Sequence, residues 1–393
     1  MPRRRTTADA RPHVVTLVDD VGTSGGGERF ARDLCLNLDA ERFERTFCVT
    51  RWWDERIDEP GVRDLVGELE GAGVRFLGLR RRSVRDLAAW RPLVRMIRAG
   101  EVDVLHAHKF GSNVWGAAFS LLRALPVFVA HEQTWSYEGK PVRKLLDRAL
   151  IARRADRFIA VSEKDKRSMV EIERIDPAKL LVMPNAIPTP ASSDGGERVR
   201  AELGLSAGDQ LVGAVCVLRP QKRLDVMLRA IAIVREEFPR VKLLLAGAGE
   251  ERDHLERVIA ELELDDCAHL LGQRTDVPDF LDALDVAALS SDYEGTPLAV
   301  MEYMEAALPI ASTAAGGVPE MIENGVHGLI VETGDHAALA AAIARLLREP
   351  DLAAELGRNA RARRREHYDT RAAAERVGDL YTGLLAAARG GDS

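Results

Sequence analysis

The sequence has few cysteines and no long apolar run. Its four cysteines, Cys35, Cys48, Cys216 and Cys267, show no CxxC spacing, so we predict neither a zinc site nor a disulfide framework. Such usage is typical of proteins in a reducing compartment. No apolar run reaches membrane-spanning length, and the basic start MPRRRTTADARPHVV lacks the apolar core of a signal peptide. We therefore expect a cytoplasmic protein, in contact with the inner face of a membrane at most peripherally.

A strong excess of one charge is also missing. The formal net charge is -7; residues up to Pro190 carry 33 Lys and Arg against 27 Asp and Glu, and the remainder carries 22 against 35. A basic excess this mild does not favour nucleic acid as a partner. It is compatible with an anionic membrane surface or acceptor, and equally with an ordinary solvated surface.

Short runs rich in Val, Ile and Leu alternate with longer helical patterns along the whole chain. This alternation is typical of βαβ units with buried parallel strands, and it predicts the α/β fold class. Predicted strands begin at residues 13, 47, 74, 102, 127, 158 and 180, and again at residues 211, 241, 267, 286, 309 and 328. The segment from about Ala337 to Arg389 is rich in Ala and Arg and is predicted to be helical.

A break in this pattern divides the chain into two. The segment IPTPASSDGG at residues 187–196 contains prolines and a glycine pair that continue neither a helix nor a strand. We predict a Rossmann-like domain at residues 1–187, a linker at 188–208, a second Rossmann-like domain at 209–368, and a C-terminal helix at 369–393 that returns to the first domain. Parallel sheets bind ligands beyond the carboxyl ends of their strands, so we expect the two domains to face each other across a ligand-binding cleft.

The segment EGTPLAVME, residues 294–302, follows a predicted buried strand. Thr296 and Pro297 suit the N-cap and the first turn of a helix, whose free amide groups and dipole attract phosphate. Glu294 lies just outside the helix start, where a carboxylate beside a diphosphate needs hydroxyl groups as partners, and a sugar supplies them. Glu302 lies in the second turn and, if it faces inward, needs a similar partner such as a ribose. The spacing alone also fits a capped helix with two solvated glutamates.

A basic cluster follows the first predicted strand of the second half. In VCVLRPQKRLDVML, the residues Arg219, Lys222 and Arg223 stand at the carboxyl end of that strand. Positive charges at this place can hold a diphosphate and stabilise the charge that develops as it leaves. The alternative is a charged first turn on a surface helix.

Two glycine-rich segments differ in what they indicate. In the loop DDVGTSGGGERFARDL, Gly25, Gly26 and Gly27 permit close approach of the backbone to a ligand, although a tight turn needs such residues anyway. LLLAGAGEERDHL contains Gly247 and Gly249, but Arg252 replaces the third glycine of the dinucleotide-binding pattern GxGxxG. A dehydrogenase is therefore not expected.

Three histidines end two consecutive predicted strands. His106 and His108 alternate on one strand and so share a face, and His131 ends the next strand. A metal site would need a further carboxylate or thiolate, so we expect none. His106 and His108 are interpreted as hydrogen-bonded polar residues at a strand end, and His131 is the candidate functional histidine.

An ordered series of motifs spans nearly the whole chain. It comprises GTSGGGER, HAHKFGSNVWG, AVSEKDK, VMPNAIP, RPQKRLD, LLLAGAGEE, LLGQRTDVPDFL, EGTPLAVMEYMEAALPI and GGVPEMIENGVHGLIV. This series resembles the GT-B retaining glycosyltransferases of family 4, the glycogen-synthase-like and sucrose-synthase-like transferases of bacteria. The resemblance implies two Rossmann-like domains, a nucleotide-diphosphate sugar as donor, and no metal or other cofactor.

The resemblance also implies roles for individual residues. The E-x7-E motif of the family falls on Glu294 and Glu302, which would contact the hydroxyls of the donor sugar and the ribose of the nucleotide. Lys222 matches the lysine that binds the diphosphate. His131 matches a histidine near the reaction centre.

Further donor contacts follow from the same resemblance. Gly26 lies in the loop that packs against the phosphates, next to Gly25, and the loop from Gly272 to Arg274 lies beside the base. Leaving-group charge would fall on Lys222, on Arg219 and on the helix start, which comprises Gly295, Thr296, Pro297 and Leu298.

The sequence departs from the family pattern at two positions. The usual phosphate arginine lies five residues before the lysine, and here that position is Val217, so Arg219 would have to replace it. Pro297 stands where many relatives have glycine, and it removes one backbone N–H that could meet the donor.

The implied reaction moves a hexose-type sugar to an acceptor hydroxyl with retained configuration. No carboxylate is a convincing covalent nucleophile, so the resemblance favours attack from the face of the leaving group, with the departing phosphate taking the proton of the acceptor. The alternatives are a nucleotide-sugar epimerase and an inert nucleotide-sugar-binding subunit; intact Lys222, Glu294 and Glu302 argue against the latter.

The acceptor would be a glycan, a lipid-linked glycan or a small molecule, bound by the first domain. Two basic amphipathic stretches there, RRRSVRDLAAWRPLVRMIRAG and RKLLDRALIARRADR, are candidates for peripheral contact with anionic lipid. Each also fits an ordinary surface helix.

Overall fold

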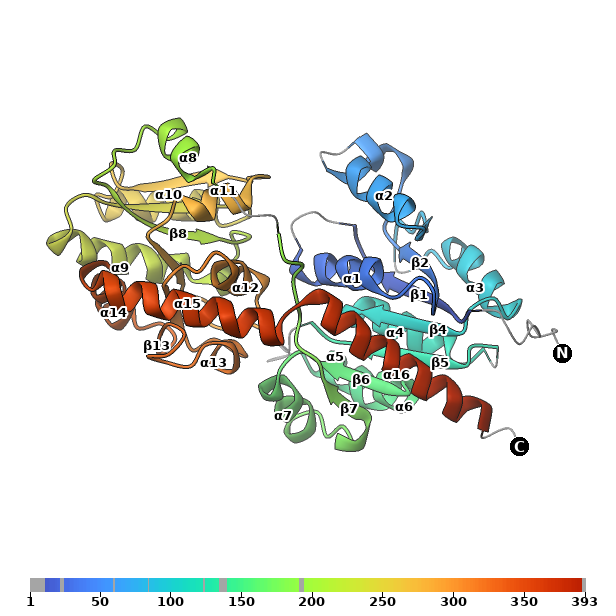
Figure 1. The fold of residues 1–393 in the computed structure, drawn as a ribbon. Coiled ribbons are helices and arrows are strands. Elements are labelled where there is room, and N and C mark those ends of the chain that lie inside the picture. The colour runs from blue at the N-terminus through green and yellow to red at the C-terminus, as the bar shows by residue number, and fades with distance from the viewer. Residues whose placement is uncertain are drawn as a thin grey trace. The chain divides into compact units, whose positions relative to one another are not determined.

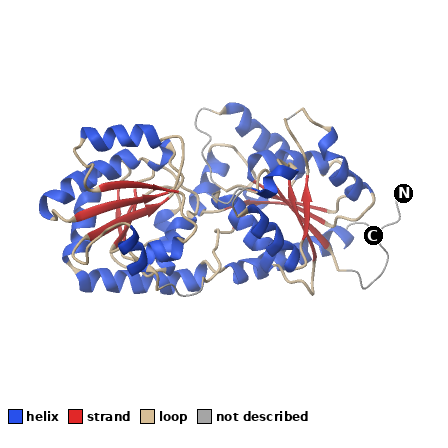
Figure 2. Ribbon diagram, turned by 90° about the horizontal axis from the view of Figure 1, so that it is seen from above, coloured by secondary structure: helices blue, strands red, loops and turns tan. Residues whose placement is uncertain are grey.

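The computed structural model describes residues 11–21, 25–58, 61–83, 85–122, 124–133, 140–190 and 194–390. The chain forms two compact units (Figure 1). Unit 1 comprises Met1–Asn185 and Thr370–Ser393, and unit 2 comprises Ala186–Asp369. Each unit is a parallel sheet with helices on both faces (Figure 2), which confirms the predicted α/β class.

Unit 1 contains a seven-stranded parallel sheet in the order β3-β2-β1-β4-β5-β6-β7. Its strands are β1 (His13–Val18), β2 (Glu44–Val49), β3 (Arg75–Gly78), β4 (Val104–His108), β5 (Val127–His131), β6 (Arg157–Ala160) and β7 (Leu180–Val182). The central strands β1, β4 and β5 are buried along their whole length, as expected for a parallel sheet covered on both faces.

The helices of unit 1 connect these strands, except for the last, which comes from the end of the chain. They are α1 (Gly26–Asn37), α2 (Val62–Gly71), α3 (Arg91–Arg98), α4 (Lys109–Phe119), α5 (Pro141–Leu146), the π-helical turn η3 (Asp147–Ile151), α6 (Ala152–Arg154), α7 (Glu163–Glu171) and α16 (Thr370–Gly390), with short 3-10 turns η1 (Asp54–Asp58), η2 (Ala88–Trp90) and η4 (Pro177–Lys179). Helix α16 packs beside α1 and over β5.

Unit 2 contains a six-stranded parallel sheet in the order β10-β9-β8-β11-β12-β13. Its strands are β8 (Gln210–Val215), β9 (Val241–Ala246), β10 (Ala268–Gly272), β11 (Val286–Leu289), β12 (Ile310–Thr313) and β13 (Leu329–Val331). Its helices are α8 (Gly196–Glu202), the 3-10 turn η5 (Pro220–Lys222), α9 (Leu224–Glu237), α10 (Arg252–Glu261), α11 (Val277–Asp282), α12 (Leu298–Glu305), α13 (Val318–Met321), α14 (His336–Arg348) and α15 (Pro350–His367).

The C-terminal segment that the sequence predicts to be helical forms three separate helices, α14, α15 and α16. Residues at the starts of α14 and α15 explain the boundaries. The carboxylate of Asp335 accepts a hydrogen bond of 2.8 Å from the amide of Ala338 and so caps α14. Pro350 stands in the first turn of α15, where its missing N–H costs nothing. Helix α14 packs on α9 and α15 on α12, whereas α16 belongs to unit 1.

Residues 188–208, placed in the linker by the sequence, belong to unit 2 where the structure describes them. Helix α8 lies within this range and packs against α11, and the amide of Gly196 donates to the carboxylate of Asp282 over 2.9 Å. Nearby, the buried side chain of Arg364 donates to the carbonyl of Ile187 over 2.6 Å and to Thr189 over 2.8 Å. These bonds attach the segment to α15.

Candidate active site

Lys222 and Glu294 form the centre of the candidate site in unit 2. The turn η5 with Lys222 follows β8, and Glu294 lies in the loop between β11 and α12. Strands β8 and β11 are neighbours in the middle of a parallel sheet, so their carboxyl ends lie side by side. The Nζ atom of Lys222 contacts Oε1 of Glu294 at 2.5 Å, and the two side chains are only 15% and 8% exposed. The fold therefore brings together two predicted site residues from separate motifs.

Hydroxyl groups hold both partners of this ion pair in place. Ser291 donates to Oε1 of Glu294 over 2.7 Å, and Thr313 donates to the carbonyl of Ser291 over 2.7 Å. On the other side, Ser290 donates to the carbonyl of Lys222 over 2.8 Å. The pair is thus positioned by a network from β11 and β12 rather than by two freely rotating side chains.

Lys222 remains charged despite its burial. Burial alone would lower the pKa of its ammonium group, but the charge and hydrogen bond of Glu294 outweigh this, and the pKa is raised above its usual value. The positive charge of Arg219 opposes this rise, which shows that Arg219 lies near Lys222. Arg219 itself is exposed, and no side-chain hydrogen bond or ion pair joins it to another described residue.

The basic cluster expected from the sequence is smaller than its three charges suggest. Arg223 is bonded to Asp225 over 3.0 Å and to Asp292 over 3.3 Å, so its charge is largely balanced by neighbouring carboxylates. Val217, at the position of the usual arginine, is half-buried. Lys222 is likewise paired with Glu294, so Arg219 is the one cation of this segment without a carboxylate partner among the described residues.

Helix α12 begins one residue later than the sequence predicts. Pro297, not Thr296, occupies the N-cap position, since its backbone is extended (ψ 122°) and the helix begins at the next residue. No side chain of the described residues caps the helix by a hydrogen bond. The first intrahelical acceptor is thus the carbonyl of Pro297, to which the amide of Met301 donates over 3.4 Å. Leu298 is buried in the first turn, and Glu302 is half-buried further along. The helix start still follows Glu294 directly, as the motif predicts.

The loop after β12 packs against the EGTP segment. The amide of Gly317 donates to the carbonyls of Glu294 and Gly295 over 3.3 and 3.1 Å. A Cβ atom on Gly316, whose φ is +56°, would lie 1.6 Å from the carbonyl oxygen of Glu294. Only glycine permits this approach.

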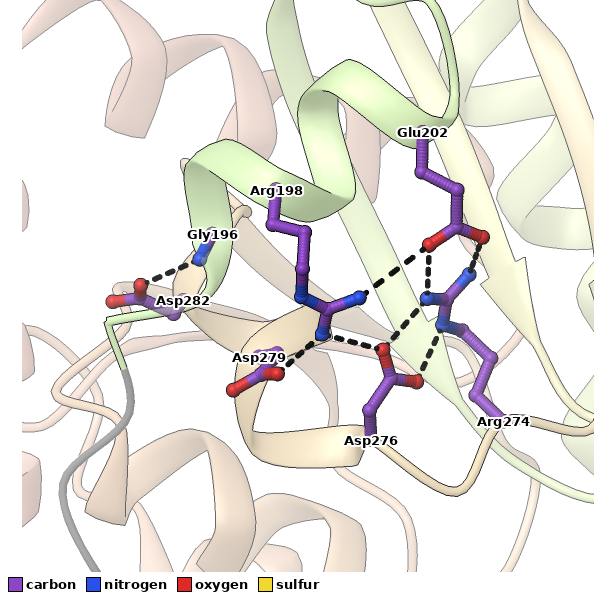
Figure 3. Close-up of polar contacts among 7 residues, drawn as sticks. All are labelled: Gly196, Arg198, Glu202, Arg274, Asp276, Asp279 and Asp282. Atoms are coloured by element: carbon purple, nitrogen blue, oxygen red, sulfur yellow. Dashed lines mark hydrogen bonds and ion pairs between the residues drawn. The ribbon is translucent and has the colours of Figure 1, made fainter.

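Gly272 and Arg274 lie at the end of β10, and their side of the site is held by a salt-bridge network (Figure 3). Gly272 has φ +73°, and its carbonyl accepts a hydrogen bond of 2.7 Å from Gly247. The guanidinium group of Arg274 donates to Glu202 of α8 over 3.0 and 2.9 Å and to Asp276 over 2.9 and 2.8 Å. The guanidinium group of Arg274 already donates to these carboxylates. The backbone N–H groups of this segment are therefore more available than Arg274 as hydrogen-bond donors to a ligand.

The glycine-rich loop of unit 1 lies at the carboxyl edge of that sheet. Gly25 is the N-cap residue of α1, and Gly26, the first residue of the helix, is exposed; residues 22–24 lie outside the described residues. Glu28 in the first turn pairs with Lys109. A Cβ atom on Gly27 would lie 2.8 Å from the side chain of Lys109, so a larger residue here would displace that side chain.

His131 is wholly buried at the end of β5. Asn113 of α4 brackets its backbone: the Asn113 amide nitrogen donates to the carbonyl of His131, and the Asn113 side-chain oxygen accepts from the His131 N–H, both over 3.2 Å. Phe30 of α1 meets the imidazole ring edge-on at a centroid distance of 5.6 Å. The ring therefore has a defined position although it does not reach solvent.

The other two histidines of this edge lie against His131. The imidazole rings of His106, His108 and His131 each offer a nitrogen within 4.8 Å of the other two, and within the described residues they form the one group with this proximity. Burial lowers the pKa of His106 to about 3, and lowers the pKa of His108 and His131 well below the usual value, so all three rings are neutral.

The hydrogen bonds of this cluster are those of an internal network. His106 Nε2 contacts His131 Nδ1 at 3.3 Å, whereas nitrogens that bind one metal ion point at the ion and not at each other. Gln133 bonds Nδ1 of His108 over 3.2 Å. Among the described residues, Nε2 of His108 and Nε2 of His131 have no partner.

The candidate residues fall into two groups. Gly25, Gly26 and His131 belong to unit 1, and the remainder belong to unit 2. Each group lies at the carboxyl edge of its own sheet. Sequence reasoning missed Ser291, which lies in the loop that carries Glu294, and Asn113, which lies in HAHKFGSNVWG. The signal available in the sequence was that both residues are polar and lie within predicted motifs.

Comparison with known proteins supports the resemblance found in the motifs. The family model for Glycosyltransferase Family 4 matches residues 24–190, and that for Glycosyl transferases group 1 matches residues 196–363. A D-inositol 3-phosphate glycosyltransferase of Thermobispora bispora is 27% identical over 74% of this chain and 72% of its own length. An Escherichia coli UDP-Gal:alpha-D-GlcNAc-diphosphoundecaprenol alpha-1,3-galactosyltransferase is 25% identical over 77% of this chain and 81% of its own.

Solved structures show the same fold. The HepE protein of Anabaena, crystallised with UDP and glucose, aligns with a TM-score of 0.81 at 21% identity, over 95% of this chain and 100% of that one. Sucrose-phosphate synthase from Thermosynechococcus elongatus aligns with a TM-score of 0.79 at 22% identity, over 96% of this chain and 100% of that one. Across the described part of the chain, no helix combines the length and the apolar character needed to cross a membrane.

Proposed function

We propose that this chain, which belongs to the group 1, family 4 glycosyltransferases of the GT-B fold, transfers a hexose-type sugar from a nucleotide-diphosphate donor to an acceptor hydroxyl. The transfer retains the configuration at the anomeric carbon and uses no metal ion. The observation that carries this proposal is the buried ion pair of Lys222 and Glu294 at the carboxyl ends of two adjacent strands. A lysine at this place can bind a diphosphate, and a glutamate beside it needs hydroxyl partners such as those of a sugar.

The relatives support the substrate classes. The Anabaena structure holds UDP and glucose, and the name of the Escherichia coli enzyme specifies UDP-galactose as donor and a diphosphoundecaprenol-linked sugar as acceptor. For this chain we propose the coarser pair of a nucleotide-diphosphate sugar and a glycan, a lipid-linked glycan or a small hydroxylated molecule. Unit 1 would bind the acceptor, and unit 2 would bind the donor.

In the proposed reaction, the bond between the anomeric carbon and the diphosphate oxygen breaks, and a bond from the acceptor oxygen to the anomeric carbon forms on the same face. The proton of the acceptor hydroxyl passes to the departing phosphate. Lys222, Arg219 and the amides at the start of α12 balance the negative charge that develops on the diphosphate, a fixed electrostatic stabilisation that needs no metal. Glu294 would accept hydrogen bonds from the sugar and Glu302 from the ribose.

Removing either partner of the ion pair should abolish most transfer. We expect Lys222→Ala and Glu294→Ala to lower kcat by roughly 10² to 10³-fold, the loss that follows removal of one preorganised charge-stabilising group. The measurement is release of free nucleotide from UDP-, GDP-, ADP- and dTDP-sugars in the presence of an acceptor panel. Circular dichroism should show that both variants remain folded.

Matched controls come from the same unit. Lys242 donates to the carbonyl of Asp266, and Glu332 is exposed, so Lys242→Ala and Glu332→Gln should retain the rate of the unaltered protein. Unimpaired turnover of Lys222→Ala would overturn the proposal. Conversion of the nucleotide sugar to its epimer without any acceptor would replace it with an epimerase. Full activity after treatment with EDTA is the expected result for a metal-independent enzyme.

A further inference from the structure

A chain of hydrogen bonds runs from the C-terminal helix to His131 inside unit 1. The hydroxyl of Tyr381, on α16, lies 2.6 Å from Nδ1 of His106. The opposite nitrogen of that ring, Nε2, lies 3.3 Å from Nδ1 of His131. Tyr381 is 1% exposed and both histidines are 0% exposed, so water does not reach these atoms.

Two proton arrangements satisfy these distances, because each neutral imidazole carries a single proton. In the first, Tyr381 donates to His106, His106 donates from Nε2 to His131, and the proton of His131 resides on Nε2. In the second, every bond is reversed, and Nε2 of His131 carries a lone pair. The first arrangement makes His131 a hydrogen-bond donor, and the second makes it a base.

The surroundings of Tyr381 decide between the two. Burial raises the pKa of its hydroxyl well above the usual value, so the proton stays on the oxygen. Among the described residues, His106 Nδ1 is the one acceptor within hydrogen-bond distance of this hydroxyl. In the reversed arrangement the hydroxyl proton would be buried without an acceptor, which is far costlier than a satisfied bond.

We propose that Tyr381 is a positioning residue that keeps His131 in the tautomer with the proton on Nε2. His131 then presents a hydrogen-bond donor, and not a proton acceptor, at the carboxyl edge of the unit 1 sheet. That this donor serves the transfer reaction rests on the proposed function; the tautomer does not.

Two further observations support this role. Nε2 of His131 is buried and has no partner among the described residues, so no hydrogen bond within that part of the chain uses it. Asn113 holds the backbone of His131 on both sides, and Phe30 packs against its ring. A ring with fixed position and fixed tautomer is what a preorganised donor requires.

The tautomer can be observed directly in the unaltered protein. Long-range proton–nitrogen spectra of the full chain labelled with nitrogen-15 histidine distinguish a ring nitrogen that bears a proton from one that does not, and the loss of signals in His131→Gln identifies those of His131. We expect a protonated Nε2 and an unprotonated Nδ1. A protonated Nδ1 would overturn the proposal. This result is independent of activity, so it separates a failure of the tautomer from a failure of the proposed function.

The role of Tyr381 is tested with Tyr381→Phe, which removes only the hydroxyl. We expect a mixture of His131 tautomers and a fall in kcat of about 3- to 10-fold, the factor carried by one neutral hydrogen bond, with a smaller change in KM for the donor. Tyr368→Phe is the matched control, because Tyr368 is also buried and its hydroxyl donates to the carbonyl of Glu320 in unit 2.

The control variant should keep both the tautomer of His131 and kcat. An unchanged tautomer in Tyr381→Phe would overturn the positioning role. An equal loss of kcat in both variants would do the same, because it would mark a general effect of removing a buried hydroxyl.

Discussion

Asp147 is a fully buried carboxyl group in the π-helical turn η3. Neither of its oxygens has a hydrogen-bond partner among the described residues, and Glu132 and Glu173 lie near enough to add repulsion. Burial, followed by these like charges, raises the pKa of Asp147 to about 9. The group is therefore a neutral acid in the folded protein at neutral pH.

This residue should make the stability of the protein fall as pH rises. Between about pH 4 and pH 9 the unfolded chain has released the proton of Asp147 while the folded protein keeps it, so the free energy of unfolding decreases through this range. Asp147→Asn mimics the neutral form and removes the effect. We expect it to raise the free energy of unfolding by roughly 1 to 4 kcal/mol near pH 8, and by much less near pH 4.

Urea unfolding followed across this pH range measures the difference. Asp265→Asn, at an exposed position of unit 2, is the control and should leave the pH dependence as it is. Parallel pH curves for Asp147→Asn and the unaltered protein would contradict the prediction.

At the scale of elements, the loop after β12 connects backbone packing to the candidate site. Gly316 must be glycine for two reasons: its φ is positive, +56°, and a Cβ atom there would lie 1.6 Å from the carbonyl oxygen of Glu294. Gly325 also has a positive φ, +78°, but a Cβ atom there would meet nothing within 4 Å. Substitutions at the two glycines therefore distinguish the effect of backbone strain from the effect of displacing Glu294.

We expect Gly325→Ala to lose about 1 kcal/mol of stability through the strained φ, and Gly316→Ala to lose more, because its Cβ would also clash with the carbonyl of Glu294. Gly316→Ala should in addition displace the backbone of Glu294 and lower kcat/KM at least about 10-fold, since small displacements of positioned groups cost large factors in rate. Thermal unfolding and nucleotide release measure the two effects. Equal activity losses in both variants would show that Gly316 has no particular connection to the site.

Two helical segments of unit 1 differ in how they use their apolar side chains. In α3, Leu93, Met96 and Ile97 are buried in the core, and Arg91, Arg95 and Arg98 are exposed. The amphipathic pattern of α3 is therefore explained by packing, and no apolar face is left for lipid.

In α5, by contrast, Val142 and Leu145 lie one turn apart and are 68% and 55% exposed. Arg148, in the following turn, is exposed as well. Exposed apolar and basic side chains on one short segment are the combination that binds an anionic interface.

At the scale of the whole molecule, we propose that α5 contacts the membrane surface in a reaction with a lipid-linked acceptor. The protein should co-sediment with vesicles that contain phosphatidylglycerol and much less with neutral vesicles, because each basic side chain near an anionic surface contributes about 1 kcal/mol. Replacing Val142 and Leu145 together by Asp should lower the bound fraction several-fold. Leu121→Asp, at a residue that is 54% exposed in the same unit, is the control. Sedimentation at background level with both kinds of vesicle would remove the membrane proposal.

Several features of the fold and the candidate site follow from local patterns. The predicted strand starts correspond to the seven and six strands of the two sheets, because most of these strands are short apolar runs that are buried or half-buried. The order of the motifs along the chain predicted the glycosyltransferase family. Local rules were less accurate at the start of α12, where Pro297 takes the cap position expected for Thr296.

The sequence by itself determined the class of each element, the division of the chain into two α/β parts, and the residue types of the candidate site, because these depend on interactions within a few residues. Only the tertiary structure decided which side chains meet. Lys222 contacts Glu294 across 72 positions, and Tyr381 contacts His106 across 275. Strand order and helix packing create such contacts, and no local pattern encodes them. For the same reason, the three charges after β8 read as one cluster in the sequence, whereas in the fold Arg223 pairs with Asp225 and Asp292.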